Sequence, residues 1–234
     1  MKKPNFTIGV EAEKIAKKVL LTPDIESCVH VAETYMQNYV KFNGNKNFTG
    51  YTGTYKGKAV TVISAGLGSA MMGFLADDLF DNYDVESVIY AGLCDSLKEE
   101  IGPRQYVLAA DAESDTTMDV AVPDGELAEA IKADFENRLE LVNFAYESPI
   151  LNIGSIVSAD YRFLDAKDAA EYIGEDLIAA DTASYTLLAK AEAAGKKAAA
   201  LLLVDRNLIT GEAMEDKEYQ RTCMRQIVTA LINL

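Results

Sequence analysis

The sequence predicts an α/β protein in which helices cover both faces of a β-sheet. Apolar runs of the length of buried strands recur along the 234 residues, and segments with apolar residues at helical spacing alternate with them. This alternation is typical of sheets with helices on both faces. Because no repeat or low-complexity linker interrupts the pattern, we expect a single domain over residues 1–234.

Most of the expected strands are near-continuous apolar runs, as in strands covered on both sides. In chain order, the expected strands cover 18–22, 51–66 (two strands), 85–92, 105–111, 139–147, 151–160 and 196–205. Residues 51–66 form an expected hairpin because Lys56-Gly57-Lys58 joins two β-rich runs. Residues 139–147 alternate between apolar and polar, which predicts a more exposed strand.

The expected helices lie between these strands and cover 69–82, 124–137, 166–173, 182–194 and 212–234. The first has apolar residues at helical spacing, the second follows Pro123, and the fourth stops at Gly195, a typical C-terminal cap. His30 is also expected to lie on a helix.

Charge and composition exclude several classes of partner. The net charge of −15 disfavours nucleic acid and anionic membranes. No apolar run has the length of a membrane span or a signal peptide, so we expect a cytoplasmic protein. Three cysteines without a CxxC pair, together with a single histidine, argue against a disulfide framework and a metal site.

Ligands of open α/β sheets bind beyond the carboxyl ends of the strands. That rule selects Gly66–Ser69, Gly92–Ser96, Ser158–Phe163 and Asp205–Asn207. In "VTVISAGLGS", a strand leads into the turn made by Gly66, Leu67 and Gly68, and the backbone amides of such a turn often face a phosphate.

Five segments together resemble the nucleoside phosphorylases, the purine and uridine enzymes of trimeric or hexameric type. "YTGTYKGKAVTVISAGLGSA" resembles their hairpin and glycine turn, and "VESVIYAGLCDSL" their next strand, which usually carries Arg-x-Gly-Ser/Thr-x-Gly. "IGSIVSADYRF" resembles their Ser-Ala-Asp turn, and "AADTASYTLLAKAEAAG" their Glu-Met-Glu helix. "LLLVDRN" stands where purine enzymes have Val-Ser-Asp-His and uridine enzymes have Val-Asn-Arg.

The resemblance covers roughly residues 19–234 and implies a three-layer αβα sandwich with a mixed central sheet. It also implies a symmetric homo-oligomer, from dimer to hexamer, whose sites are completed by a neighbour. In the family, phosphate attacks the anomeric carbon of a nucleoside, giving free base and ribose 1-phosphate. Neither a metal nor an organic cofactor takes part, so the implied ligand is a nucleoside or base.

The implied phosphate site has lost most of its positive charge. The family's Gly-Asp-Pro-x-Arg loop is "TPDIESCV" here, with Asp24 and Glu26 and without the arginine. Tyr90 replaces a second arginine, and Leu93 replaces the phosphate-binding serine or threonine. Lys46 is a loose match to the arginine that a neighbour contributes. A phosphate dianion needs charge-assisted donors, so phosphate binding is doubtful although the glycine turn remains.

The implied sugar site is also altered. Asp181 replaces the family's first glutamate and could accept a hydrogen bond from a ribose hydroxyl. The alternative is that Asp181 caps the N-terminus of the helix that follows. Thr182 stands for the methionine, and Ala183 for the second glutamate. Arg162 stands where the aromatic wall of the sugar pocket is usual.

The implied base site contains Asp205 and Arg206. When the segment is aligned with the purine enzymes without a gap, Arg206 falls on the position of their general-acid aspartate. Asp205 takes that position only if the alignment is shifted by one residue. Matched to uridine enzymes instead, Arg206 could stabilise negative charge on a leaving uracil. The third interpretation is that both residues only form ion pairs. Cys94 lies beside this site and is expected to be a buried structural thiol.

Three functions follow from these observations. The chain cleaves nucleosides with an altered pocket, or it is a non-catalytic relative that binds a nucleoside or base or acts as a scaffold. The third is a hydrolase that needs no phosphate, for which Glu11, Glu13 and Asp24 are the candidate water-activating carboxylates.

Overall fold

The structure is a computed structural model that describes residues 8–43, 48–115 and 151–215. Its elements, in chain order, are a 3-10 turn (Ala12–Lys14), β1 (Lys18–Thr22), α1 (Ile25–Tyr35), β2 (Gln37–Asn43), β3 (Thr49–Tyr55), β4 (Lys58–Ser64), α2 (Gly68–Asp77), a π-helical turn (Asp78–Asn82), β5 (Ser87–Ser96), β6 (Tyr106–Asp115), β7 (Leu151–Ala159), β8 (Leu177–Asp181), α4 (Ser184–Ala193) and β9 (Lys197–Asn207). The expected helix 124–137, the expected strand 139–147 and most of the expected helix 212–234 lie outside the described residues.

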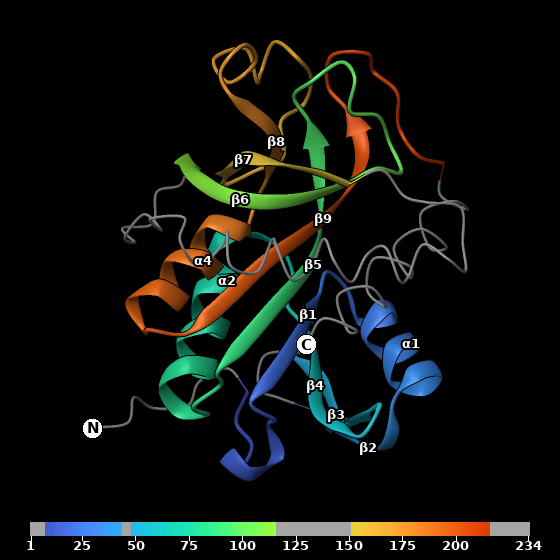
Figure 1. The fold of residues 1–234 in the computed structure, drawn as a ribbon, viewed down its shortest axis with the longest axis vertical. Coiled ribbons are helices and arrows are strands. Elements are labelled where there is room, and N and C mark those ends of the chain that lie inside the picture. Colours follow the sequence, from blue (N-terminus) through green and yellow to red (C-terminus); the bar gives the residue numbers. More distant parts are fainter. Residues whose placement is uncertain (1–7, 44–47, 116–150, 216–234) are drawn as a thin grey trace.

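Within the described residues, nine strands form one mixed sheet in the order β2-β3-β4-β1-β5-β8-β7-β6-β9. β1 is parallel to β4 and β5, whereas β3 is antiparallel to both of its neighbours. β9 also pairs with β5, so the strands β5, β8, β7, β6 and β9 close on one another (Figure 1). The central sheet is therefore mixed and strongly curved.

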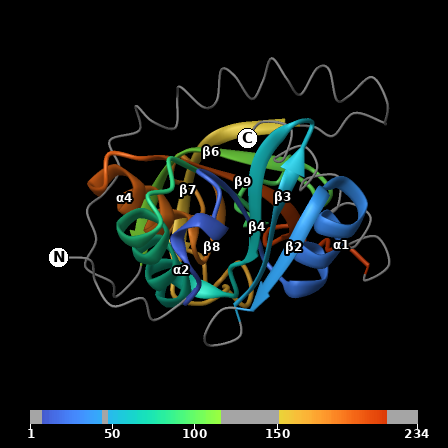
Figure 2. The same ribbon diagram turned by 90° about the horizontal axis from the view of Figure 1, so that it is seen from below.

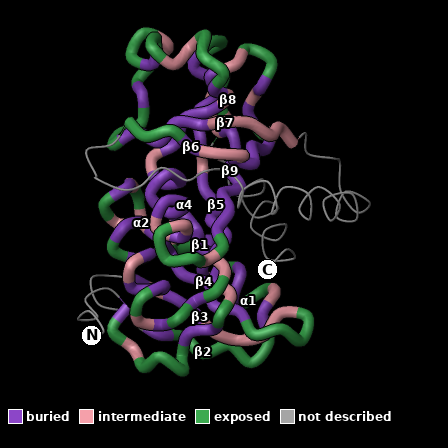
Figure 3. Tube along the Cα trace, turned by 60° about the vertical axis from the view of Figure 1, so that its left-hand side comes forward, coloured by how far each residue is buried: buried purple, intermediate pink, exposed green. Residues whose placement is uncertain are grey.

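Helices cover both faces of the sheet, as the sequence predicts. α1 lies on one side, and α2 and α4 lie together on the other (Figures 1 and 2). The alternation of β1 explains both contacts: Val19 and Leu21 pack with the cluster of α2 and α4, whereas Leu20 packs with the α1 side. Figure 3 shows the buried strands between these layers. The three-layer αβα sandwich is confirmed.

The expected strands 18–22, 51–66 and 151–160 are confirmed within a few residues, and the helix expected at His30 is α1. Two strands were not predicted, β2 and β8. The expected helix 166–173 is wrong: the chain makes turns there, because Gly174, at φ +110°, and an isolated bridge between Ile173 and Glu175 redirect it after about one turn. Residues 212–215, at the start of the last expected helix, are also non-helical.

β5 is longer than the expected strand 85–92 and reaches Ser96. The extension is held by β9 on one side and by β8 on the other, where Asp95 pairs with Ala180 and Ser96 with Ala179. Asp95 and Ser96 thereby become part of the sheet at its carboxyl edge.

Candidate functional site

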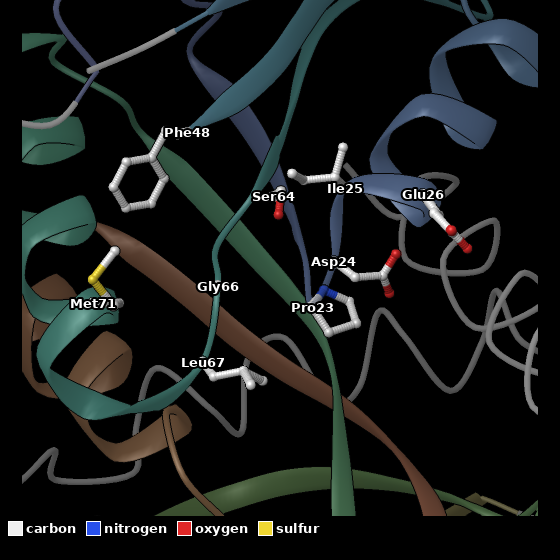
Figure 4. Close-up of a pocket in the computed structure, with 9 residues that line it drawn as sticks. All are labelled: Pro23, Asp24, Ile25, Glu26, Phe48, Ser64, Gly66, Leu67 and Met71. Carbon is white, nitrogen blue, oxygen red and sulfur yellow. The ribbon is translucent and has the colours of Figure 1, made fainter. Parts of the chain in front are cut away.

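A cavity of about 640 Å³ lies where β1 and β4 end (Figure 4). Its lining comes from the turn into α1 and the first turn of that helix, from the end of β4 with the turn into α2, from α2 itself and from the residue before β3. The lining residues are Pro23, Asp24, Ile25, Glu26, Phe48, Ser64, Gly66, Leu67 and Met71. A volume of about 300–1,000 Å³ is usual for small-molecule sites.

Asp24 stands at this cavity because it caps α1. Its carboxylate accepts hydrogen bonds from the backbone amide of Ser27 at 2.7 Å and from the Ser27 hydroxyl at 2.8 Å. Glu26 follows in the first turn, where the helix dipole favours negative charge. Of the described residues that line the cavity, two are therefore carboxylates and none is a cation.

The glycine turn forms the opposite wall. Gly66 and Gly68 have φ of +73° and +84°, which side chains rarely adopt, so the turn requires glycine at both positions. The Ser69 hydroxyl then donates to the carbonyl of Thr182 at 2.9 Å, which ties the start of α2 to the start of α4.

Tyr90 and Leu93 do not come together, because they lie on opposite faces of β5. Tyr90 is buried on the side of α2 and α4, and its ring lies over Gly92, where a Cβ atom would be 2.4 Å from the ring. Leu93 packs on the side of α1. Tyr90, which the sequence resemblance matches to a phosphate-binding arginine, is thus a buried aromatic ring.

Cys94 is fully buried. Burial raises the pKa of its thiol well above the ordinary value, and the nearby carboxylates of Asp205, Asp181 and Asp95 raise it further. The side chain is therefore a neutral thiol and not a nucleophilic thiolate.

The Asp181 carboxylate is buried and accepts four hydrogen bonds. They come from the Ser158 hydroxyl, the Ala183 amide at 3.2 Å, and the amide and hydroxyl of Ser184 at 2.9 and 2.6 Å. Burial raises its pKa, although these hydrogen bonds lower it. Its oxygens accept hydrogen bonds from the backbone amides of Ala183 and Ser184, but the N-cap residue of α4 is Ala183, so Asp181 holds the start of the helix from two residues before the cap.

Four charged side chains from three segments meet beyond the ends of β5 and β9, and we call them the aspartate–arginine cluster: Asp95, Arg162, Asp205 and Arg206. The Asp95 side chain is only 2% exposed and lies between both guanidinium groups. Arg206 donates to its two oxygens from Nε at 3.1 Å and from Nη2 at 2.9 Å. Arg162 also donates a hydrogen bond to each of the two Asp95 oxygens, one from Nε at 3.3 Å and one from Nη2.

Arg162 also donates two hydrogen bonds to the Asp205 carboxylate, from Nη1 at 3.0 Å and from Nη2 at 2.7 Å. Asp205 faces Arg162 because the register between β5 and β9 shifts after Cys94: Cys94 pairs with Val204, and Asp95 pairs with Arg206. Asp205 is the extra residue of this bulge, and bulges of this kind redirect side chains. Asp205 and Arg206 therefore form ion pairs with other members of the cluster and not with each other.

The cluster also fastens the segment after β7. Arg206 donates to the backbone carbonyls of Leu164, at 3.1 Å, and Phe163. Arg162 itself lies in this segment, so two guanidinium groups hold it against the ends of β5 and β9.

The two carboxylates and two guanidinium groups carry no net charge. Burial alone would lower the pKa of Arg162, but its hydrogen bonds to Asp205 and Asp95 outweigh burial and raise it, so Arg162 stays cationic. Each arginine uses four of its five N–H donors within the described residues, which leaves one Nη1–H on each. These two donors can bind a carbonyl oxygen or ring nitrogen.

Sequence reasoning missed Asp95. The available signal was "YAGLCDSL", in which an aspartate takes the place of the last glycine of the family's Arg-x-Gly-Ser/Thr-x-Gly pattern. Lys46 lies outside the described residues. Within the described ranges, no three His, Cys, Asp or Glu side chains are grouped so that they could hold a metal ion. No helix in those ranges is long and apolar enough to cross a membrane.

Comparisons with known proteins agree with this architecture. The model of the phosphorylase superfamily matches residues 18–233. The chain is 32% identical over 228 residues to the purine nucleoside phosphorylase DeoD-type of Bacillus subtilis (strain 168), covering 96% of each chain. It is 32% identical over 225 residues to that of Oceanobacillus iheyensis, covering 92% of each.

Solved structures show the same fold. The uridine phosphorylase from Vibrio fischeri ES114 superposes with a TM-score of 0.81 at 19% identity, over 96% of this chain and 94% of that chain. A structure from a study of uridine phosphorylases of Phytophthora capsici superposes with a TM-score of 0.79 at 18% identity, over 97% of this chain and 92% of that chain. The chain therefore belongs to the phosphorylase superfamily, as a member of its nucleoside phosphorylase family.

Proposed function

We propose that the chain binds a nucleoside along the carboxyl edge of the sheet and cleaves its N-glycosidic bond. The observation that carries this proposal is the aspartate–arginine cluster, where buried Asp95 fixes two guanidinium groups that each keep one free N–H within the described structure. A base that leaves an anomeric carbon gains negative charge, and preorganised donors stabilise such charge. The family and the names of the relatives support the same reaction class.

Phosphate is disfavoured as the acceptor. Asp24 and Glu26 line the cavity at the loop where the family holds phosphate. At an effective dielectric constant of 20, each unit charge about 4 Å from a carboxylate costs about 4 kcal/mol. We therefore propose cleavage with water or another neutral acceptor. The order Val204-Asp205-Arg206 favours a pyrimidine carbonyl as the group that Arg206 contacts, but a purine nitrogen suits the same donors.

A nucleoside panel tests the proposal. Adenosine, inosine, guanosine, uridine and thymidine are incubated with and without phosphate, and free base is measured by chromatography. We expect base release that phosphate does not accelerate and that Arg162→Gln reduces at least about 100-fold. Arg104→Gln is the matched control, because Arg104 is equally exposed and pairs with Glu212 outside the cluster. No base release from any nucleoside would refute cleavage, and strong acceleration by phosphate would refute the altered acceptor.

Non-catalytic binding is the second candidate. The neutral charge of the cluster favours it, because the guanidinium groups give no net positive field to a developing anion. Saturable binding of a nucleoside in calorimetry, with no base release by the same sample, would establish this alternative.

We also propose that the chain forms a cytoplasmic homo-oligomer, between dimer and hexamer, as its family resemblance implies. Light scattering on a size-exclusion column measures the oligomer directly, and a monomer at micromolar concentration would contradict the proposal.

A further inference from the structure

The acidic residues are unevenly distributed along this chain. The chain has 37 acidic residues and a net charge of −15, but residues 34–76 contain four lysines and no aspartate or glutamate. This stretch includes β2, β3, β4 and nearly all of α2. β2 is an end strand of the sheet, whereas β9, at the other end of the strand order, pairs a second time with β5. The open edge of the sheet, within the described residues, therefore lies in the basic part of an otherwise acidic protein.

Exposed lysines and partly exposed tyrosines lie together at this edge. The Lys41 ammonium lies 5.8 Å from the centre of the Tyr51 ring, and the Lys56 ammonium lies 5.4 Å from that of the Tyr55 ring. Lys41, Lys56 and Lys58 are exposed, and none of them forms an ion pair with a carboxylate of the described residues. We call these groups the lysine–tyrosine surface: Tyr39, Lys41, Tyr55, Lys56 and Lys58. Tyrosine is enriched at protein interfaces, and unpaired cations on such a surface fit an acidic partner.

The opposite end of the molecule is acidic. Residues 160–176, which we call the acidic segment, contain two cations, Arg162 and Lys167, and Arg162 is already paired within the aspartate–arginine cluster. The segment has six exposed acidic residues: Asp160, Asp165, Asp168, Glu171, Glu175 and Asp176. Figure 1 shows this segment at the top of the long axis and β2, β3 and β4 at the bottom. The two ends of the molecule therefore carry opposite charge.

We propose that two copies of the chain associate side by side in opposite directions, so that the acidic segment of each lies on the lysine–tyrosine surface of the other. One molecule cannot bring its own two ends together, whereas a two-fold dimer makes the same contact twice. A second copy is favoured over an unrelated acidic protein because the chain itself supplies the complementary surface. The inference rests on the proposed homo-oligomer and names the surfaces that hold it, and it does not depend on cleavage.

Charge reversal on the full chain tests the inference. The basic-surface variant carries Lys41→Glu, Lys56→Glu and Lys58→Glu, and the acidic-segment variant carries Glu171→Lys, Glu175→Lys and Asp176→Lys. Sedimentation velocity at low salt measures the mass of each variant and of their equimolar mixture. We expect the dissociation constant of each variant alone to rise at least about 10-fold, because like charges then face each other at both contacts. The mixture should recover the wild-type mass, because both contacts are again between opposite charges, and high salt should weaken the wild-type contact.

The matched control has the same charge change at exposed positions outside the acidic segment: Glu13→Lys, Glu33→Lys and Glu86→Lys. It should keep the wild-type mass, and in a mixture it should restore the basic-surface variant no better than wild type does. Wild-type mass in either charge-reversal variant alone, or no recovery in their mixture, would overturn the inference and leave an oligomer held by other surfaces. A monomeric wild type would overturn both the inference and the proposed oligomer. Base release by the same samples reports on cleavage separately.

Discussion

Replacing Asp95 by asparagine should destabilise the protein strongly. The substitution keeps the shape of the side chain and removes its charge. Asp95 is the carboxylate that pairs with Arg206 in the described structure, since Asp205 pairs with Arg162 instead. The variant therefore leaves the Arg206 guanidinium without a counter-charge at the edge of the sheet.

The expected cost is about 3 kcal/mol. Breaking a buried ion pair by removing one partner costs about 3–5 kcal/mol. The arginine side chains are 44% and 30% exposed, so water compensates part of the loss and the lower end applies. For a domain of this size, about 3 kcal/mol lowers the melting temperature by about 6–12 °C.

Urea unfolding followed by circular dichroism, at one fixed protein concentration, measures this change. Asp84→Asn is the control, because Asp84 also bridges two cations, Lys17 and Lys196, but its side chain is 73% exposed. Its loss should have a much smaller effect, and one that 1 M salt abolishes. If Asp95→Asn destabilises the protein no more than Asp84→Asn does, the aspartate–arginine cluster does not hold this edge together.

Two further variants test other parts of the same edge. Asn207→Ala should cost about 3 kcal/mol in urea unfolding, because the buried Asn207 amide bonds five backbone groups of two loops; a loss below about 1 kcal/mol would contradict this role. Burial raises the pKa of Asp181 above its ordinary 3.8, so the folded state holds this proton more tightly than the unfolded chain, and the free energy of unfolding should fall as pH rises from 3.8 through the raised pKa. Asp181→Asn should lack that fall between pH 3.5 and 7, and an unchanged pH dependence would refute the assignment.

The local pattern of apolar residues and glycines in the sequence was sufficient to predict the layers of the fold. Runs such as 18–22 and 196–205 are apolar enough to predict buried strands, and Gly66 and Gly68 predict their turn because few other residues adopt its backbone conformation. The sequence predicted a helix at His30 but not the bounds of α1, because "IESCVHVAETY" contains several residues with weak helix propensity. Its start depends on the cap that Asp24 supplies to Ser27.

The sequence by itself determined most strands of the sheet, the helices that cover it and the glycine turn after β4, because these follow from hydrophobic periodicity and the conformational limits of glycine. Only the tertiary structure decided which charges meet. Arg162 reaches Asp95 across 67 residues of sequence and Asp205 across 43, and the bulge that turns Asp205 toward it exists only in the pairing of β5 with β9. Strand register depends on the packing of the whole sheet, so no local pattern could have joined these four side chains.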